Sequence, residues 1–590
     1  MMARTGRLYG RVGQSADARA LDESGRAFGP RASRADSSRR REDGSVTMPW
    51  LDKEDLRQLG AAGTAVLRSK MLVPPGPRAA SRMFSAFWRF GPTAALPIAI
   101  SAARWPERVA LVDDDGKLTY RDLVGESEAL ADALAASYQE LQSRRAHSVG
   151  VFCRNHRGFV IALLAGCLLG KEIVFINYDL TAKQLAPLLS RHGIDLMLHD
   201  EDLGQTLDEA GYTGRRAVPT DPSAVPRKTA GRRRRTPSLL PVEMTLLTSG
   251  TTGAPKGVPR AIRPVAGLFT LASALAATRL RSGQVAAVTS PLFHGLGIAA
   301  GLGFLALGDT VLIRRRYSAD LLYRDIEEHG VEVIMTVPTV LARLTEAARA
   351  AERARDMSSL KLVLSGGALL PAPVVRDFTA AFGPVAVNGY GTTELGIISF
   401  ADPRDLAEEP ATVGRPIVGA SVKILRPDRT EAAVGESGVI FAKGTAAYAG
   451  YTPDPNAKVK AKEVVAGHIS TGDMGHFDAK GLLYVDGRED DMIVSGGENI
   501  FPSEVEEALL AHPSVADAAV VGVPDSEFGQ CLRAFLVLRQ GAARVEDDAL
   551  KAFLRDSLER YKIPKQFHVL PELPRNPSGK VLRTTLATLD

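Results

Sequence analysis

The chain has 590 residues, of which 45% are hydrophobic and 24% are charged, as is typical of a soluble globular protein with several domains. This composition excludes collagen, a coiled coil and wholesale disorder. Three cysteines spread along the chain cannot build a disulfide framework or a cysteine metal site, which predicts a reducing, cytoplasmic location. The longest apolar run, residues 295–308, is too short to cross a bilayer, which takes about 18 residues.

The positive charge is concentrated at the start of the chain. Residues 1–47 contain ten arginines and six acidic residues, a net charge of +4 out of +5 for the whole chain. This segment lacks the apolar periodicity of a folded element, the apolar stretch of a signal peptide and the acid-poor composition of a transit peptide. We expect residues 1–47 to be a disordered basic tail, or translation begun upstream of a start at Met48, and we expect no nucleic-acid partner.

A patch of basic and aromatic residues precedes the first predicted strand. It consists of Arg82, Phe84, Phe87, Trp88, Arg89 and Phe90. Two interpretations are open: peripheral contact with a membrane surface, or packing onto the main body, which we favour. No segment predicts a transmembrane helix, and the sequence does not predict the oligomeric state.

Apolar strands alternate with apolar helical stretches through the first two thirds of the chain. The expected strands are 108–112, 149–152, 173–176, 244–247, 285–288, 310–313, 333–337, 360–364 and 385–387. This alternation predicts an α/β fold in which mainly parallel sheets are covered by helices.

The pattern changes after residue 414. Short β-type runs with Gly and Pro turns, at 422–425, 438–441 and 482–485, predict a β-rich subdomain. Helices at 503–511 and 546–560 and strands near 518–522 and 533–538 predict a small α+β unit. We therefore expect a large N-terminal domain over residues 48–489 and a small C-terminal domain over residues 490–590.

Four polar or glycine-rich segments follow predicted strands of the large domain, at 248–257, 291–295, 365–368 and 388–394. Ligands of open α/β sheets bind beyond the carboxyl ends of the strands, so these segments predict one shared site. The first segment offers glycines, hydroxyls and a lysine, which suit a polyphosphate. It is not a Walker A loop, because the second glycine and the Ser or Thr after the lysine are missing.

Five motifs, in order along the chain, resemble those of the adenylate-forming superfamily of acyl- and aryl-CoA synthetases, peptide-synthetase adenylation domains and luciferases. They lie at 248–257, 390–394, 470–473, 487–500 and 576–580. The resemblance implies that a carboxylate attacks the α-phosphate of ATP, giving an acyl-adenylate and pyrophosphate, and that a thiol then displaces AMP. It also implies ATP and Mg²⁺ as cofactors and CoA as a co-substrate.

The same resemblance assigns the residues of the site. Lys580 bridges the carboxylate and the α-phosphate, Thr393 touches the α-phosphate, and Glu394 is the metal ligand. The residues expected around the nucleotide are Thr248, Ser249, Gly250, Thr251, Thr252, Gly253 and Lys256 at the phosphates, Gly366, Gly367 and Tyr390 at the adenine, and Asp473 and Arg488 at the ribose. The remaining assignments are His294 and Gly295 for the acid, Gly496 and Gly497 for the pantetheine path, and Asp490 for the hinge between an adenylating and a thioester-forming pose.

The identity of the acid depends on the segment after His294. The glycines at 295, 297, 301 and 303 leave room for a long acyl tunnel or permit close helix packing, and both interpretations are open. Amino-acid-activating relatives carry an aspartate near this segment, so His294 favours an acid without an α-ammonium group. We predict an acyl-CoA synthetase for a medium- or long-chain fatty acid. The alternatives are an aryl- or bile-acid-type CoA ligase, a fatty-acyl-AMP ligase that loads a carrier protein, and a non-catalytic nucleotide- or lipid-binding scaffold.

Overall fold

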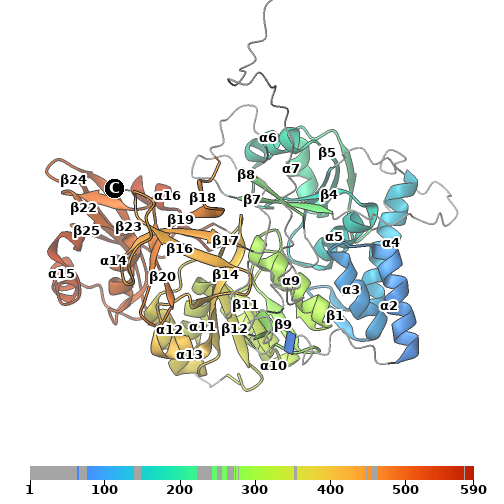
Figure 1. Cartoon of the computed structure of the whole chain (residues 1–590), viewed down its shortest axis with the longest axis horizontal. Coiled ribbons are helices and arrows are strands. Elements are labelled where there is room, and N and C mark those ends of the chain that lie inside the picture. The colour runs from blue at the N-terminus through green and yellow to red at the C-terminus, as the bar shows by residue number, and fades with distance from the viewer. Residues whose placement is uncertain are drawn as a thin grey trace, which may run out of the picture. The chain divides into compact units, whose positions relative to one another are not determined.

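The structure is a computed structural model. It describes residues 63–64, 76–137, 148–221, 242–248, 256–261, 272, 274–276, 278, 280–350, 355–444, 450, 452, 461–576 and 579–589. All of these residues belong to one unit, residues 57–590. The expected α/β class is confirmed, with mainly parallel sheets in the N-terminal part and a small α+β part near the C-terminus (Figure 1).

A nine-stranded sheet carries most of the expected site. Its strands, in order across the sheet, are β15 (Arg415–Pro416), β14 (Gly396–Ala401), β13 (Ala386–Thr392), β12 (Leu362–Gly366), β11 (Val333–Thr336), β9 (Val285–Val288), β10 (Thr310–Leu312), β1 (Val109–Asp113) and β2 (Gly116–Thr119). The six inner strands, from β13 to β1, pair in parallel, and the outer strands pair antiparallel. The inner strands other than β13 are mostly apolar because both faces of the sheet are covered.

The remaining N-terminal strands form a second, six-stranded sheet. Their order is β6 (Arg215–Ala217), β5 (Ile194–His199), β3 (Ser148–Phe152), β4 (Glu172–Phe175), β7 (Glu243–Thr248) and β8 (Lys256–Ala261). All neighbours pair in parallel except β7 and β8, which form a hairpin with Thr248 opposite Lys256. The division of the strands between two sheets depends on pairing partners that hydrophobic periodicity does not reveal.

Helices cover both sheets. They are α3 (Ala95–Arg104), α4 (Tyr120–Ser137), α5 (Arg157–Leu169), α6 (Ala182–His192), α7 (Gly204–Glu209), α9 (Gly295–Leu307), α10 (Ala319–His329), α11 (Pro338–Ala350), α12 (Ala372–Phe382) and α13 (Pro403–Glu408). Residues 158–167 of α5 are all buried, because this helix is apolar on every side and its Phe159 stacks on Phe175 of the second sheet. One apolar core includes residues of both sheets, so it joins them.

Helix α2 (Pro77–Phe90) lies on the outer side of α3 (Figure 1). It buries Ala79, Ala86 and Phe90, but it leaves Phe84, Phe87 and Trp88 exposed by 67%, 51% and 57%. The expectation that the aromatic patch packs onto the main body is therefore wrong for these three residues. No helix within the described ranges is both long enough and apolar enough to cross a membrane.

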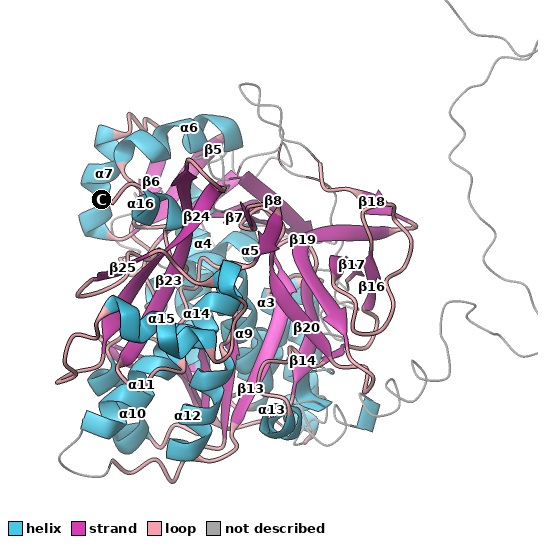
Figure 2. Ribbon diagram, turned by 90° about the vertical axis from the view of Figure 1, so that its left-hand side faces the viewer, coloured by secondary structure: helices cyan, strands magenta, loops and turns pink. Residues whose placement is uncertain are grey.

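The last third of the chain contains the β-rich subdomain and the small α+β part (Figure 2). The subdomain sheet runs β16 (Ser421–Leu425), β17 (Gly438–Lys443), β19 (His468–Phe477) and β18 (Val464–Val465), with β20 (Leu483–Arg488) also pairing with β19. The α+β part consists of the hairpin β21 (Ile493–Ser495) and β22 (Glu498–Ile500), the sheet β23 (Val515–Asp525), β24 (Gly529–Leu538) and β25 (Gln566–Val569), and helices α14 (Pro502–Leu510), α15 (Asp547–Arg555) and α16 (Arg583–Ala587). Helix α15 is shorter than the expected helix at 546–560. The domain boundary at residue 490 stays a prediction.

Asp309 is a fully buried acid at the start of β10, on the edge of the sheet opposite the expected site. Its Oδ1 atom accepts hydrogen bonds from the backbone N–H groups of Gly283 (2.7 Å) and Gln284 (3.0 Å). Within the described part of the chain, its Oδ2 atom has no hydrogen-bond partner. Burial raises the pKa of Asp309 to about 8, so the folded protein holds this carboxyl protonated at neutral pH.

We expect the free energy of unfolding to fall as the pH rises from about 4 to about 8, by up to about 1.4 kcal/mol per pH unit from this group. The sign follows because the folded state binds one proton more than the unfolded state in this window. Asp309→Asn removes the titration and keeps an acceptor oxygen, so its stability should depend less on pH than that of the wild type. Thermal unfolding across this window measures both slopes, and parallel curves for the two proteins would contradict the assignment.

Candidate active site

The expected adenine and acid residues meet at the carboxyl edge of the nine-stranded sheet. His294 follows β9 and caps α9, Gly366 ends β12, and Tyr390 lies in β13. A Cβ atom at Gly366 would lie 2.8 Å from the backbone oxygen of Gly389, so β12 and β13 approach each other too closely for a side chain here. The Cβ positions of Gly366 and Gly367 both face Leu296 of α9, at 3.6 and 3.5 Å. The convergence predicted from the loops is confirmed for these segments.

Tyr390, Asp473 and Arg488 form a hydrogen-bonded chain between two sheets. The Tyr390 hydroxyl donates to Asp473 Oδ2 (2.6 Å), and Arg488 Nη1 donates to Asp473 Oδ1 (3.1 Å). Asp473 is buried, and β19 and β20 place it directly opposite Arg488. Burial and the charge of Asp473 raise the pKa of Tyr390 well above its usual value, so the hydroxyl stays protonated and donates. These three residues offer a planar ring and a fixed carboxylate side by side, as an adenine and its ribose require.

Arg488 also contacts the expected hinge residue. Its Nε atom donates to Asp490 Oδ1 (3.0 Å) and its Nη2 atom to Asp490 Oδ2 (3.3 Å). Although burial would raise the pKa of Asp490, the hydrogen bonds and charge of Arg488 hold this pKa below its usual value. Arg488 therefore divides its donors between the carboxylate expected at the ribose and the carboxylate expected at the hinge. The role of Asp490 as a hinge stays a prediction.

The loop that carries Lys580 lies against the same edge. Gly579 has φ of +80°, and its Cβ position faces Val337, the residue after β11, at 3.3 Å. Lys580 itself is exposed. Burial, and in second place the positive charge of Lys580, lowers the pKa of His294 to about 4, so His294 is neutral at pH 7. The position of Gly579 against Val337 places the Lys580 loop at the carboxyl edge of the nine-stranded sheet, far from it in the sequence.

Arg575 is a positioning residue that the sequence analysis missed. Its Nη1 atom donates to the backbone oxygen of Gly579 (2.6 Å), and its Nη2 atom donates to both carboxylate oxygens of Asp517 (2.9 and 2.8 Å). These bonds tie the Lys580 loop to β23. The sequence indicated Arg575 only by its position directly before the motif at 576–580.

Asn155 is a second missed residue. It is buried in the segment after β3, where its Nδ2 atom donates to the backbone oxygen of Ser290 (3.0 Å) and its Oδ1 atom accepts from the backbone N–H of Leu292 (2.8 Å). Asn155 therefore holds the segment before His294 from the other sheet. The sequence indicated it only as a polar residue three positions after a predicted buried strand.

Part of the expected phosphate loop lies outside the described residues. Thr248 ends β7 and Lys256 begins β8, and the two residues lie opposite each other in the hairpin. Ser249, Gly250, Thr251, Thr252 and Gly253 all belong to that connection, which the structure does not describe. Their contact with phosphates stays a prediction.

Two further predicted groups lie in turns. Thr393 and Glu394 are half-buried in the turn between β13 and β14, which begins directly after the strand of Tyr390. Gly496 and Gly497 form the exposed turn of the β21–β22 hairpin, with φ of +61° and +91°, which explains why both are glycines. The backbone N–H of Gly496 donates to the backbone oxygen of Phe528 (3.0 Å), so this turn contacts the β23–β24 hairpin.

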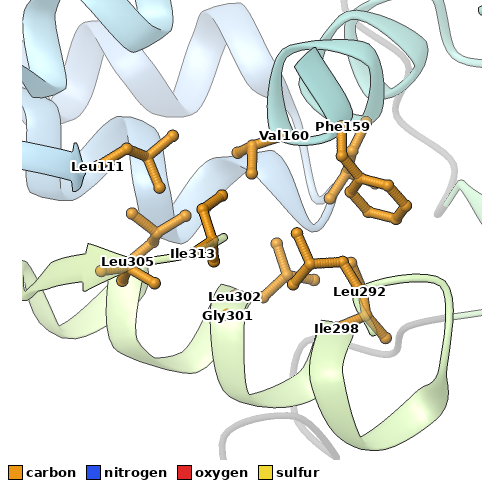
Figure 3. A pocket seen from close by; sticks show the side chains of 11 residues that line it. Leu111, Phe159, Val160, Leu292, Ile298, Gly301, Leu302, Leu305 and Ile313 are labelled. Atoms are coloured by element: carbon orange, nitrogen blue, oxygen red, sulfur yellow. The ribbon is translucent and has the colours of Figure 1, made fainter. Parts of the chain in front are cut away.

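The glycines of α9 bear on the size of the acid. A Cβ atom at Gly297 would lie 2.1 Å from the backbone oxygen of Pro291, and one at Gly301 would lie 3.2 Å from Leu292 Cδ2. The apolar cavity beside α9 holds only about 10 Å³, roughly one water-sized sphere (Figure 3). Of the two open interpretations, close packing therefore describes Gly297 and Gly301.

We expect Gly297→Ala to destabilise the protein by about 1–3 kcal/mol, because the new methyl group would clash with the backbone before His294. Gly303→Ala is the matched control in the same helix, since nothing lies within 4 Å of its Cβ position. The control should change stability by no more than about 1 kcal/mol, in the stabilising direction. Thermal unfolding of both variants tests this, and equal effects would contradict the packing assignment.

Comparison with known proteins identifies the family. Residues 98–452 match the AMP-binding enzyme family, and residues 504–580 match the C-terminal domain of AMP-binding enzymes. Among curated relatives, sulfoacetate–CoA ligase of Cupriavidus necator is 33% identical (84% of this chain, 97% of the relative), 2-succinylbenzoate–CoA ligase of Bacillus licheniformis is 32% identical (82% and 97%), and feruloyl-CoA synthase of an Amycolatopsis species is 31% identical (81% and 95%).

The fold matches a solved relative over the same span. The o-succinylbenzoate CoA synthetase of Bacillus subtilis, solved with its acyl-adenylate intermediate, has a TM-score of 0.72 and 29% identity, covering 84% of this chain and 98% of that chain. A structure of the same enzyme with ATP and a magnesium ion gives a TM-score of 0.70 and 30% identity, with 83% and 98% covered. Since the family match spans more than half of the chain and relatives above 30% identity are covered almost entirely, the chain belongs to the AMP-binding enzyme family.

Proposed function

We propose that the chain is an ATP-dependent, AMP-forming ligase that joins an aromatic acid to CoA. The observation that carries the proposal is the hydrogen-bonded chain of Tyr390, Asp473 and Arg488 in a fold shared with CoA ligases. The relatives named above are CoA ligases or synthetases, and one of them was solved with an acyl-adenylate bound.

In this proposal the chain's residues position two substrates and neutralise charge. Tyr390 flanks the adenine, and Asp473 accepts hydrogen bonds from the ribose hydroxyls. Lys580 lies between the carboxylate of the acid and the α-phosphate, where its charge offsets the negative charge that develops as the carboxylate oxygen bonds to phosphorus and pyrophosphate leaves. A thiolate then attacks the acyl carbon, and AMP departs as the leaving group.

The residues at the turn after β13 fit a magnesium ion. Mg²⁺ prefers oxygen ligands, and Glu394 offers a carboxylate next to the hydroxyl of Thr393 in a half-buried turn. Glu394 is the residue that would hold the ion, as the resemblance implies. The bound ion would supply charge neutralisation on the phosphate oxygens of ATP.

The choice of an aromatic acid over a fatty acid rests on the relatives. They are named for sulfoacetate, 2-succinylbenzoate and ferulate, none of which is a fatty acid. His294 is uncharged at neutral pH and stands beside Phe293, with ring centroids 4.9 Å apart, which favours an acid without an ammonium group over an amino acid.

A substrate panel tests the proposal. Benzoate, ferulate, 2-succinylbenzoate, sulfoacetate, octanoate, palmitate and an amino acid are compared by pyrophosphate release and by AMP release, each with and without CoA. We expect aromatic acids to exceed palmitate by at least about tenfold in kcat/KM, and we expect AMP release to require CoA. Preference for palmitate would restore the fatty-acid interpretation. Acyl-adenylate formation without CoA-dependent AMP release would favour a carrier protein as the acceptor.

A further inference from the structure

Helix α2 carries an exposed aromatic face that the catalytic fold does not explain. Phe84, Phe87 and Trp88 are each more than half exposed, and the Trp88 ring lies edge-on to both phenylalanine rings, with centroids 6.0 Å apart. The family match begins at residue 98, after this helix has ended, and no residue assigned to the site lies in α2 or α3. The face therefore serves something other than nucleotide or acid binding.

The residues of α2 fall into three sectors, because a helix turns by about 100° per residue. Ala79, Ala86 and Phe90 point into the protein and are buried. The three exposed aromatic residues occupy the sector on one side of this buried stripe. The sector on the other side holds the exposed residues Arg78, Ser81, Arg82, Ser85 and Arg89.

Contacts with neighbouring helices hold the basic sector in place. The Nε atom of Arg82 donates to the backbone oxygen of Ala103 in α3 (2.9 Å), and Arg89 pairs with Glu128 of α4. The helix itself contains three arginines and no acidic residue. Aromatic rings thus lie beside a fixed positive sector on the outer side of the fold.

We propose that this face, consisting of Phe84, Phe87 and Trp88 with Arg78, Arg82 and Arg89, docks the protein onto the surface of a membrane that contains anionic lipids. Phe and Trp rings partition into the boundary between headgroups and acyl chains, and arginines attract anionic headgroups. Charge complementarity favours an anionic membrane over a protein surface that lacks acidic residues, because every charged residue of the helix is positive. The net charge of +4 on residues 1–47 has the same sign and would add to the attraction.

The test uses the full chain and vesicles of phosphatidylcholine, with and without phosphatidylglycerol, in a flotation assay. We expect binding to the anionic vesicles that weakens in high salt, and little binding to vesicles of phosphatidylcholine alone. The triple variant Phe84→Ser, Phe87→Ser, Trp88→Ser should bind the anionic vesicles at least about tenfold more weakly. Its turnover in solution, without vesicles, should equal that of the wild type and shows that the variant is folded.

Two matched variants separate the parts of the proposal. The double variant Val434→Ser, Val464→Ser removes two apolar side chains of the β-rich subdomain, which are 68% and 59% exposed. This variant should leave vesicle binding unchanged. Arg78→Glu should weaken binding to the anionic vesicles. Absence of binding by the wild type, or equal binding by the triple variant, would overturn the proposal. A wild-type dimer that the triple variant converts to a monomer in light scattering would also overturn it, by assigning the face to a second copy of the chain.

Discussion

Lys580→Ala should lower the rate of adenylate formation by about 10²- to 10³-fold and leave the second half-reaction, from preformed acyl-adenylate to acyl-CoA, close to the wild-type rate. The physical reason is that the Lys580 ammonium, whose loop lies at the carboxyl edge of the nine-stranded sheet, is expected to offset the charge that develops between the carboxylate and the α-phosphate. Attack of the thiol on the acyl carbon does not need that cation. ATP–pyrophosphate exchange measures the first step, and AMP release from added acyl-adenylate with CoA measures the second.

Two controls keep this result interpretable. Lys551→Ala removes a lysine of the same part of the chain, on α15, where it pairs with Asp548 at 3.7 Å, and it should change neither step. Lys580→Arg keeps the charge with a different shape and should recover part of the exchange rate. Exchange by Lys580→Ala at the wild-type rate would remove Lys580 from the catalytic residues.

Asp473→Ala should raise the KM for ATP by about 10- to 100-fold, because the variant loses the carboxylate expected to accept from both ribose hydroxyls. The loss also leaves Tyr390 and Arg488 without a shared acceptor at a buried position. We therefore expect a lower melting temperature as well, since the Tyr390 hydroxyl would lose its acceptor at a partly buried position. Equilibrium binding of AMP separates the loss of nucleotide affinity from any loss of folded protein.

Tyr390→Phe and Asp478→Ala complete the Asp473 series. Tyr390→Phe removes only the hydroxyl that donates to Asp473, so it should raise the KM for ATP by less than Asp473→Ala does. Asp478→Ala removes a carboxylate that accepts backbone hydrogen bonds in the turn after β19, and it should leave the KM for ATP unchanged. A normal KM for ATP in Asp473→Ala would show that the ribose binds elsewhere.

Much of the fold and the order of the site segments could be predicted from the sequence. Parallel strands place their carboxyl ends at one edge of a sheet, so the sequence predicted that the segments of His294, Gly366 and Tyr390 lie close together. These predictions succeeded because they depend on local chemistry and on chain direction.

Other features depend on contacts between distant segments, which a single sequence does not reveal. The bond from Tyr390 to Asp473 joins residues 83 positions apart, and Asn155 reaches across to a loop of the other sheet. Close packing at Gly297 and Gly301 of α9 depends on Pro291 and Leu292, which lie near their Cβ positions, and the sequence alone left this packing open. Phe84, Phe87 and Trp88 of α2 were expected to pack onto the main body, but the buried face of this helix consists of Ala79, Ala86 and Phe90.

Arg488 has a consequence for the timing of the two half-reactions. A guanidinium has a limited number of N–H groups, and Arg488 shares its own between Asp473 and Asp490. If sugar hydroxyls bind Asp473, as the proposed function requires, they would compete with Arg488 for the same oxygen atoms, and the displaced N–H group would be free to bond Asp490 more closely. Occupancy of the proposed nucleotide pocket would then be transmitted, through a single side chain, to the stretch of backbone about which the terminal lobe is expected to swing.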